Sequence, residues 1–180
     1  MEDIKYENNN FKFAYRVSAI IYNFDKTKIL LFAGNDSDFY MLPGGKVKEL
    51  KKSTDAIKRE IQEEIGFDNL DFELAGISEE IIKNNNENIQ QITLTYRCIY
   101  NGEITKETFK SIESDWINFK WVGVNEIEQY KIHTQNIQIM VKDCNTIKHL
   151  VEQFNLYRRN KSNIKKYKWI KYLKMAKCSK

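Results

Sequence analysis

Three glutamates lie close together within the segment 42–67, LPGGKVKELKKSTDAIKREIQEEIGF. Glu60, Glu63 and Glu64 stand at positions i, i+3 and i+4, and in a helix this spacing places all three carboxylates on one side. Like charges at this spacing weaken an isolated helix, so the cluster indicates a function. Carboxylate oxygens are the ligands that a hard divalent cation such as Mg²⁺ prefers. The alternative interpretation is a solvated acidic helix face.

The neighbouring residues predict the backbone that positions these carboxylates. Pro43, Gly44 and Gly45 predict a turn, because proline fixes φ and glycine adopts backbone angles that are closed to other residues. A helix is expected to follow, with Ser53 as its N-cap and Gly66 as its C-terminal stop. The segment therefore places a glycine turn ahead of a helix that carries the carboxylate cluster.

The whole segment resembles the Nudix box of the Nudix hydrolases, which runs Gly, five residues, Glu, seven residues, then Arg-Glu-U-x-Glu-Glu-x-Gly-U, where U is bulky and apolar. Gly45 opens the box, and residues 59–67 close it without insertion. One position departs, because the first glutamate of the box falls on Lys51. Either Glu49 supplies this carboxylate through a local shift of the loop, which we expect, or the brace that the acid gives Arg59 is missing.

The resemblance implies an α/β (α+β) fold, a Nudix-type mixed β-sheet sandwiched between helices. It also implies Mg²⁺-dependent hydrolysis of a diphosphate bond in a nucleoside diphosphate linked to another group, with Mn²⁺ as the alternative ion. Arg59 is expected to orient the acids by charge-assisted hydrogen bonds, and Glu64, Glu63 or a later acid to serve as general base. Accessory acids are expected beyond the box, at Glu79 or Glu80. The expected metal ligands are Glu60, Glu63, Glu64 and the carbonyl of Gly44.

Residues outside the helix are expected to bind the substrate. Arg16 lies in a predicted strand over residues 13–22, and its guanidinium suits phosphate oxygens, which it can bind two at a time. The alternative for Arg16 is an outward-facing position in the period-two alternation of the strand. Gly45 and Tyr40 complete the expected substrate site. The aromatic candidates for stacking on a base are Phe39, Tyr40 and Trp116.

The remaining chain predicts further strands and one more helix. Residues 1–10 are expected to be a loose lead-in, and His133 and His149, which lack partners at ligand spacing, are expected to have no chemical role. The expected strands cover residues 29–33, 39–42, 70–78, 91–100 and 115–124, and the helix covers residues 134–154.

Composition indicates a soluble protein. The 180 residues suit one domain with an appendage, and 42% hydrophobic with 30% charged residues is ordinary for a globular chain. No apolar run has the length of a membrane span, and the N-terminal residues lack the pattern of a signal peptide. The three cysteines are far apart and without metal-type spacing, so we expect a cytoplasmic location. The sequence leaves the oligomeric state open.

Residues 157–180 differ in kind from the rest, because they contain ten basic residues and no acid, which leaves residues 1–156 with a formal charge of −6. We expect a Nudix hydrolase domain over residues 1–156 and a basic amphipathic helical extension over residues 157–180. RNA or an anionic surface is the candidate partner of this extension. The equally open alternative is a helix that packs its apolar stripe on the acidic domain.

Two other functions fit the same residues. A Nudix-fold module could bind a nucleotide or RNA with little turnover, because the ammonium of Lys51 would compete with a cation. An RNA-directed hydrolase of the decapping type could use residues 157–180 to hold RNA. A small-molecule nucleotide or nucleotide derivative is nevertheless the expected substrate, because the Arg-Glu-x-x-Glu-Glu set is intact.

Overall fold

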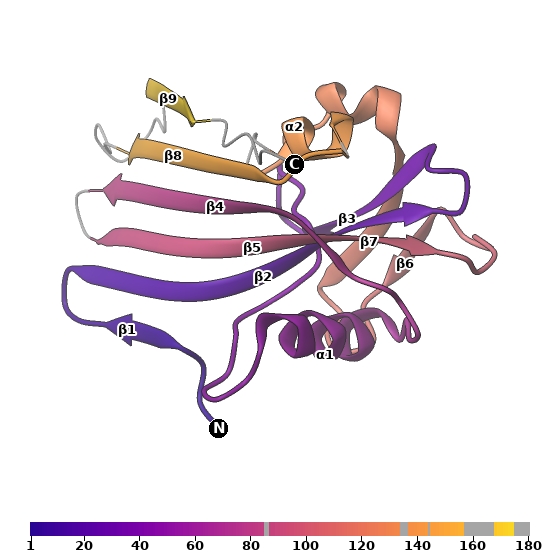
Figure 1. Ribbon diagram of the computed structural model, residues 1–180, viewed down its shortest axis with the longest axis horizontal. Coiled ribbons are helices and arrows are strands. Elements are labelled where there is room, and N and C mark those ends of the chain that lie inside the picture. Colours follow the sequence, from indigo (N-terminus) through magenta and orange to yellow (C-terminus); the bar gives the residue numbers. More distant parts are fainter. Residues whose placement is uncertain (85–86, 134–136, 144, 157–167, 175–180) are drawn as a thin grey trace.

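The longest strands, β2 (Phe11–Asn23), β4 (Glu73–Asn84) and β5 (Asn88–Tyr100), lie side by side in the middle of one mixed sheet (Figure 1). The computed structural model describes residues 1–84, 87–133, 137–143, 145–156 and 168–174. β2 runs parallel to β5, and β5 runs antiparallel to β4. The expected mixed sheet is therefore confirmed.

Shorter strands extend this sheet on both sides, in the order β6-β7-β3-β2-β5-β4-β8-β9, and β1 pairs with the first residues of β2. The β4–β8 pair is parallel, and β8 pairs antiparallel with β9. The bounds are β1 (Lys5–Glu7), β3 (Lys28–Gly34), β6 (Thr108–Lys110), β7 (Ile117–Gly123), β8 (Lys148–Leu156) and β9 (Lys168–Lys174).

Helices cover both faces of the sheet (Figure 1). Helix α1 (Ser53–Ile65) packs Ile57 and Ile61 with Val17 of β2 in one apolar core. The 3₁₀-helix η1 (Val124–Gln129) and helix α2 (Ile137–Lys142) pack in a second core that contains Ile20 of β2. Residues of opposite parity along β2 thus serve the two cores, as the alternation of a strand requires.

The expected end of α1 is confirmed at its C-terminus, whereas its expected N-cap is not. Gly66 lies in the left-handed region with φ 76°, and its N–H bonds the carbonyl of Gln62, as expected for a C-terminal stop. The N-cap is Lys52 rather than Ser53, and it makes no side-chain cap bond. The Ser53 hydroxyl instead lies 2.7 Å from the Tyr96 hydroxyl, so it ties the helix to β5.

Besides the N-cap, four expectations of secondary structure are wrong. Residues 137–142 are the only part of the expected 134–154 helix that is helical among the described residues, and residues 148–156 form β8. Residues 168–174 form strand β9 instead of a helix, whereas the rest of the 157–180 extension lies outside the described residues. The lead-in is ordered through β1. In these three cases pairing with a neighbouring strand outweighs the local pattern. Residues 39–42, expected to be a strand, make only isolated bridges, Met41 with Phe32 and Tyr40 with Ile132.

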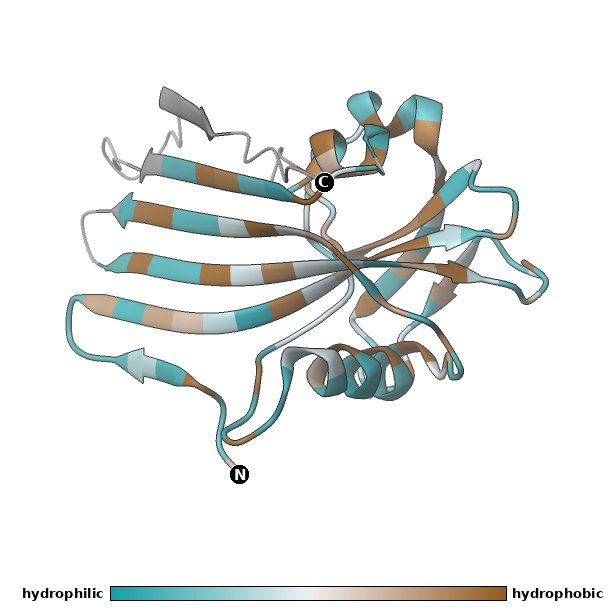
Figure 2. Cartoon of the chain, viewed as in Figure 1, coloured by the Kyte–Doolittle hydropathy of each residue, from teal (hydrophilic) through white to brown (hydrophobic). Residues whose placement is uncertain are grey.

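The strands alternate in hydropathy along their length, and Figure 2 shows hydrophilic positions in β2, β4 and β5 where they extend beyond α1. No helix among the described residues combines the length and the apolar character that a membrane span needs.

Candidate active site

The glycine turn lies against β2. The carbonyls of Pro43 and Gly45 accept hydrogen bonds of 2.9 Å from the N–H groups of Ala19 and Val17. Gly44, between them, has φ +143°, and a Cβ there would overlap the Val17 carbonyl oxygen. Only glycine fits this close approach without strain. The Gly44 N–H is directed to α1, so the turn links the central strand to the carboxylate helix.

Glu64 is the buried acid of α1, with 8% of the residue exposed. Its Oε2 accepts a hydrogen bond of 3.2 Å from the Gly44 N–H. Burial raises the pKa of Glu64 to about 7, against the opposing effect of the Gly44 N–H. The charges of Glu60 and Glu113 raise it further, whereas Arg16 lowers it. Burial therefore favours the protonated form of the Glu64 carboxyl group, and a nearby cation would favour the ionised form.

Arg59 organises the other two acids of the cluster. Its guanidinium pairs with the Glu60 carboxylate, donates to the Lys46 carbonyl at 3.1 Å and lies 3.4 Å from Glu63 Oε2. Glu60 in turn packs so closely on Gly45 that a Cβ at this glycine would overlap its carboxylate. Arg59 thus holds the acids against the glycine turn.

The position that departs from the Nudix box lies on the surface. Glu49 and Lys51 are both exposed, and neither contacts Arg59. The expected replacement of the missing acid by Glu49 is therefore not seen. The Lys46 carbonyl, on the chain just before this loop, accepts the hydrogen bond from Arg59 instead.

The residues of the cluster fit a hard divalent cation by their chemistry. They offer carboxylate oxygens, and burial together with like charge makes the ionised form of Glu64 costly until a cation is bound. Among the described residues, no group of three or more His, Cys, Asp or Glu side chains is already placed to hold a metal ion.

Arg16 connects the acid cluster to a pocket of about 230 Å³ on the opposite face of the sheet. It lines this pocket, and its charge lowers the pKa values of both Glu64 and His133. His133 also lines the pocket, and burial is the main reason that its pKa is low. His133 was expected to have no chemical role, yet it forms part of the pocket wall. Apolar wall residues are Phe32, Met41, Leu42 and Ile137.

The two accessory acid candidates lie apart, because neighbouring residues of a strand face opposite sides. Glu80 is buried in the wall of this pocket and accepts a hydrogen bond of 2.6 Å from Gln91 Nε2. Glu79 pairs at 2.7 Å with His149. Glu80 therefore belongs to the pocket, and Glu79 does not.

Glu113 is an acid near the cluster that the sequence did not indicate. The Ile112 N–H and the Ser111 hydroxyl bond the Glu64 carbonyl at 2.9 and 3.0 Å, so their loop lies against the last turn of α1. From this loop the Glu113 charge raises the pKa of Glu64. Glu113 lies near Glu64 only because this loop packs against α1, so no motif spacing in the sequence could have predicted its position.

The aromatic candidates have separate positions. Tyr40 makes an edge-on contact with Tyr130, and Phe39 makes one with His133. Trp116 is 58% exposed and packs part of its ring close to Gly34. None of the three lines the pocket that contains Arg16.

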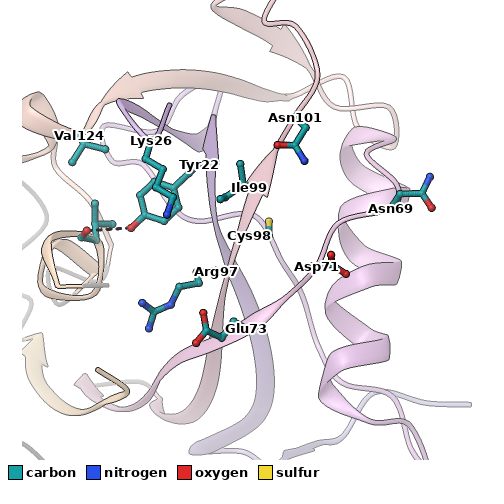
Figure 3. Close-up of a pocket in the computed structure, with 11 residues that line it drawn as sticks. Tyr22, Lys26, Asn69, Asp71, Glu73, Arg97, Cys98, Ile99, Asn101 and Val124 are labelled. Atoms are coloured by element: carbon teal, nitrogen blue, oxygen red, sulfur yellow. Dashed lines mark hydrogen bonds between the residues drawn. The ribbon is translucent and has the colours of Figure 1, made fainter. Parts of the chain in front are cut away.

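A second pocket, of about 430 Å³, lies at the other end of β2 and β5 (Figure 3). Arg97 and Glu73, which are cross-strand partners, project into it together. The Tyr22 hydroxyl closes one side by donating to the Val141 carbonyl at 3.1 Å. None of the α1 carboxylates lines it, so this pocket is separate from the acid cluster.

Comparisons with known proteins agree with this fold. The mutator MutT protein from Bacillus halodurans has a similar structure, with TM-score 0.58, 15% identity, and coverage of 87% of this chain and 97% of that one. The E. coli dihydroneopterin triphosphate pyrophosphohydrolase aligns with TM-score 0.57 and 15% identity over 71% of this chain and 92% of that one. At these identities the likeness shows the fold.

Sequence comparison adds a local match and a family. The m7GpppN-mRNA hydrolase of Saccharomyces cerevisiae (strain ATCC 204508 / S288c) is 43% identical over 54 residues, which are 30% of this chain and only 6% of that protein. The sequence model of the NUDIX domain matches residues 12–143, well over half of the chain. The chain therefore belongs to the NUDIX domain family and is a hydrolase of the Nudix type.

Proposed function

We propose that this Nudix hydrolase cleaves a diphosphate bond in a nucleoside diphosphate linked to a second group, with Mg²⁺ as its cofactor. The observation that supports this most is the position of Arg16. It lines a pocket on one side, and its charge reaches the buried Glu64 on the other. A nucleotide with its nucleoside in the pocket would extend its phosphates past Arg16 to the carboxylates of α1.

Each group of residues at the site would then have its own role in binding the metal or the substrate. Glu60, Glu63, Glu64 and the Gly44 carbonyl would hold the metal, which when bound neutralises the diphosphate charge and activates a water. Arg59 keeps Glu60 and Glu63 in place through its contacts with both. Arg16 would bind a phosphate, for which the guanidinium has the right donors. Gly45 packs against Glu60, and Tyr40 directly precedes the pocket residues Met41 and Leu42, so we keep both in the proposed substrate site although Tyr40 does not line the pocket itself.

A proton acceptor is also needed for the attacking water. Glu113 is exposed, lies outside α1 and is close enough to influence Glu64, so we assign this role to Glu113. Glu64 and Glu63 are the other acids for this role. Glu79, which pairs with His149, is not proposed for it.

A turnover screen tests the proposal. Nucleoside triphosphates, dinucleoside polyphosphates, nucleotide sugars and capped RNA would be incubated with Mg²⁺ or Mn²⁺ and the products separated by chromatography. We expect turnover of at least one class, and a loss of about a hundredfold or more in Glu64→Gln, which keeps the side-chain size. Glu79→Gln is the matched control and should be fully active. Full activity of Glu64→Gln at saturating Mg²⁺ would refute the assignment.

Capped RNA is included because of one observation, the 43% identity to an m7GpppN-mRNA hydrolase. If capped RNA is cleaved in clear preference to free nucleotides, the decapping-type alternative is correct, and residues 157–180 become the candidate RNA contact. If nothing is cleaved but nucleotides bind, the chain is a binding module.

A further inference from the structure

The loop 111–116, which joins β6 to β7, presents large apolar side chains to solvent on either side of an acid of the site. Ile112 is 70% exposed and Trp116 is 58% exposed, whereas Trp121, in the strand that follows, is 4% exposed. Glu113, to which we assigned the role of proton acceptor, lies between the two exposed residues. Exposed apolar side chains that gather in one place mark a contact site more often than scattered ones do. The loop is therefore a candidate for contact with the substrate.

Hydrogen bonds hold this loop in place at both ends. At its start, the Ser111 hydroxyl and the Ile112 N–H donate to the Glu64 carbonyl. At its end, the Trp116 carbonyl accepts a hydrogen bond of 2.9 Å from the Asn35 N–H. The Trp116 ring therefore projects from an anchored backbone, and binding a ligand through it costs little ordering of the chain.

The Trp116 ring lies on the side of the sheet that α1 covers. Leu30 and Phe32, at positions of β3 that alternate with Gly34, both belong to the core beneath α1. Because side chains of a strand alternate between its two faces, a Cβ at Gly34 would point to the same side. Such a Cβ would lie 3.2 Å from two carbon atoms of the Trp116 ring. The ring thus rests on the end of β3, on the face where the carboxylate helix lies.

The carboxylate cluster is near both the pocket and this loop. The charge of Arg16, from β2, and the charge of Glu113, from the loop before β7, both act on Glu64. β3 separates β2 from β7 in the sheet, so the two charges come from different parts of it. A nucleotide with its nucleoside in the pocket and its diphosphate at the cluster would extend its second group toward the loop. Trp116 follows Glu113 by three residues, which span at most roughly 10 Å, so its ring is within reach of that group.

We propose that Trp116 stacks on a second nucleobase, so that the substrate is a dinucleoside polyphosphate, an inference that rests on the proposed function. Every base has a π-face, so an exposed indole ring selects for the presence of a base rather than for its type. The loop also carries Glu113 and Asp115 and no basic residue, which favours a second group without negative charge. A free dinucleoside polyphosphate and the cap of an RNA share this chemistry, so either can be the source.

The test compares substrates that differ in whether the second group carries a base. Diadenosine diphosphate is paired with ADP-ribose, diguanosine diphosphate with GDP-mannose, and diuridine diphosphate with UDP-glucose. kcat and KM are measured with Mg²⁺, and dissociation constants by titration calorimetry in EDTA. Stacking a base on an aromatic side chain contributes roughly fivefold to 150-fold in affinity. We expect the dinucleotide to exceed its nucleotide sugar by about tenfold in kcat/KM, mainly through KM.

Trp116→Ala is the decisive variant, and Phe24→Ala is its matched control, because Phe24 is a 75% exposed aromatic residue in the turn after β2. Trp116→Ala should raise KM for the dinucleotide about tenfold and change KM for the nucleotide sugar less than twofold. Trp116→Phe, which keeps a ring, should retain most of the preference, and Phe24→Ala all of it. Equal kcat/KM for both members of each pair in the wild type, or an unchanged preference in Trp116→Ala, overturns the proposal. If Trp116→Ala does not fold, the wild-type comparison decides alone.

The two proposals fail separately. If no compound is hydrolysed, the proposed function is wrong, and the EDTA titrations still decide whether Trp116 stacks on a base. Dinucleotides that do not bind, or that bind wild type and Trp116→Ala equally tightly, overturn the stacking proposal.

A comparison of m7GpppG with GpppG identifies the source of the second base. N7-methylated guanine carries a positive charge, which an indole face binds well. A higher kcat/KM for m7GpppG points to an RNA cap, and an equal or lower value points to free dinucleoside polyphosphates.

Discussion

Replacing Glu64 by glutamine should make the metal-free protein more stable, and the gain should depend on pH. A carboxyl group with a raised folded-state pKa binds more protons in the folded than in the unfolded protein. Its unfavourable effect on stability therefore develops as the pH rises from about 4.5 to about 7, and it is complete above pH 7. Below pH 4.5 both states are protonated and the effect is absent.

The magnitude follows from the pKa difference. Glu64 moves from its ordinary value of 4.5 to about 7, and each pH unit corresponds to about 1.4 kcal/mol, so the cost of ionising it in the folded protein approaches about 3 kcal/mol. Glutamine keeps the shape and can still accept from the Gly44 N–H. We therefore expect Glu64→Gln to exceed the wild type by about 2–3 kcal/mol at pH 8 and by under about 1 kcal/mol at pH 5.

Urea denaturation in EDTA at pH 5 and pH 8 measures this difference. Glu63→Gln is the matched control, because its side chain is 46% exposed and its loss should change stability by less than about 1 kcal/mol at either pH. Adding Mg²⁺ should stabilise the wild type at pH 8 and stabilise Glu64→Gln much less, since a ligand stabilises the state it binds. An equal stability difference at both pH values would refute the argument from burial.

Two further predictions concern the loop before α1. Gly44→Ala should destabilise the protein by about 2 kcal/mol or more in urea denaturation, because its Cβ meets the Val17 backbone at positive φ. Gly45→Ala should instead displace the Glu60 carboxylate, so we expect turnover to fall tenfold or more with little loss of stability. A larger loss of stability in Gly45→Ala than in Gly44→Ala would contradict this. Lys51→Glu and Glu49→Ala should each change kcat/KM by less than about threefold, because neither residue contacts Arg59; a sharp rise in turnover for Lys51→Glu would show instead that a missing brace limits the site.

The sequence predicted the helix of the site well because its signals are local. The end of α1 at Gly66 depends on a backbone angle that glycine favours, and the positions of Glu60 and Glu64 on one side depend only on helix geometry. The carboxylate helix and the glycine turn could thus be placed without knowing the rest of the fold.

The pocket could not be predicted in the same way, because its residues come from distant strands. Arg16 had two interpretations, and only the pairing of β2 with β5 shows that it faces the pocket. His133 and Glu113 reach the site through loops, for which no periodicity exists. Residues 148–154 were expected to be helical, but the parallel pairing of β8 with β4 makes them part of a strand.

The parallel pairing of β2 with β5 has a consequence for how the chain folds. Ser18 and Thr95 are partners although 77 residues separate them, and the intervening chain includes α1 and β4. Contacts of such sequence separation are slow to form, because a long loop must close before they stabilise anything. During synthesis β2, which contains Ile20 and Ile21, both fully buried in the folded protein, therefore lacks its partner β5 until residue 100 has left the ribosome. An exposed apolar strand in this interval is prone to aggregate and is a natural substrate for chaperones.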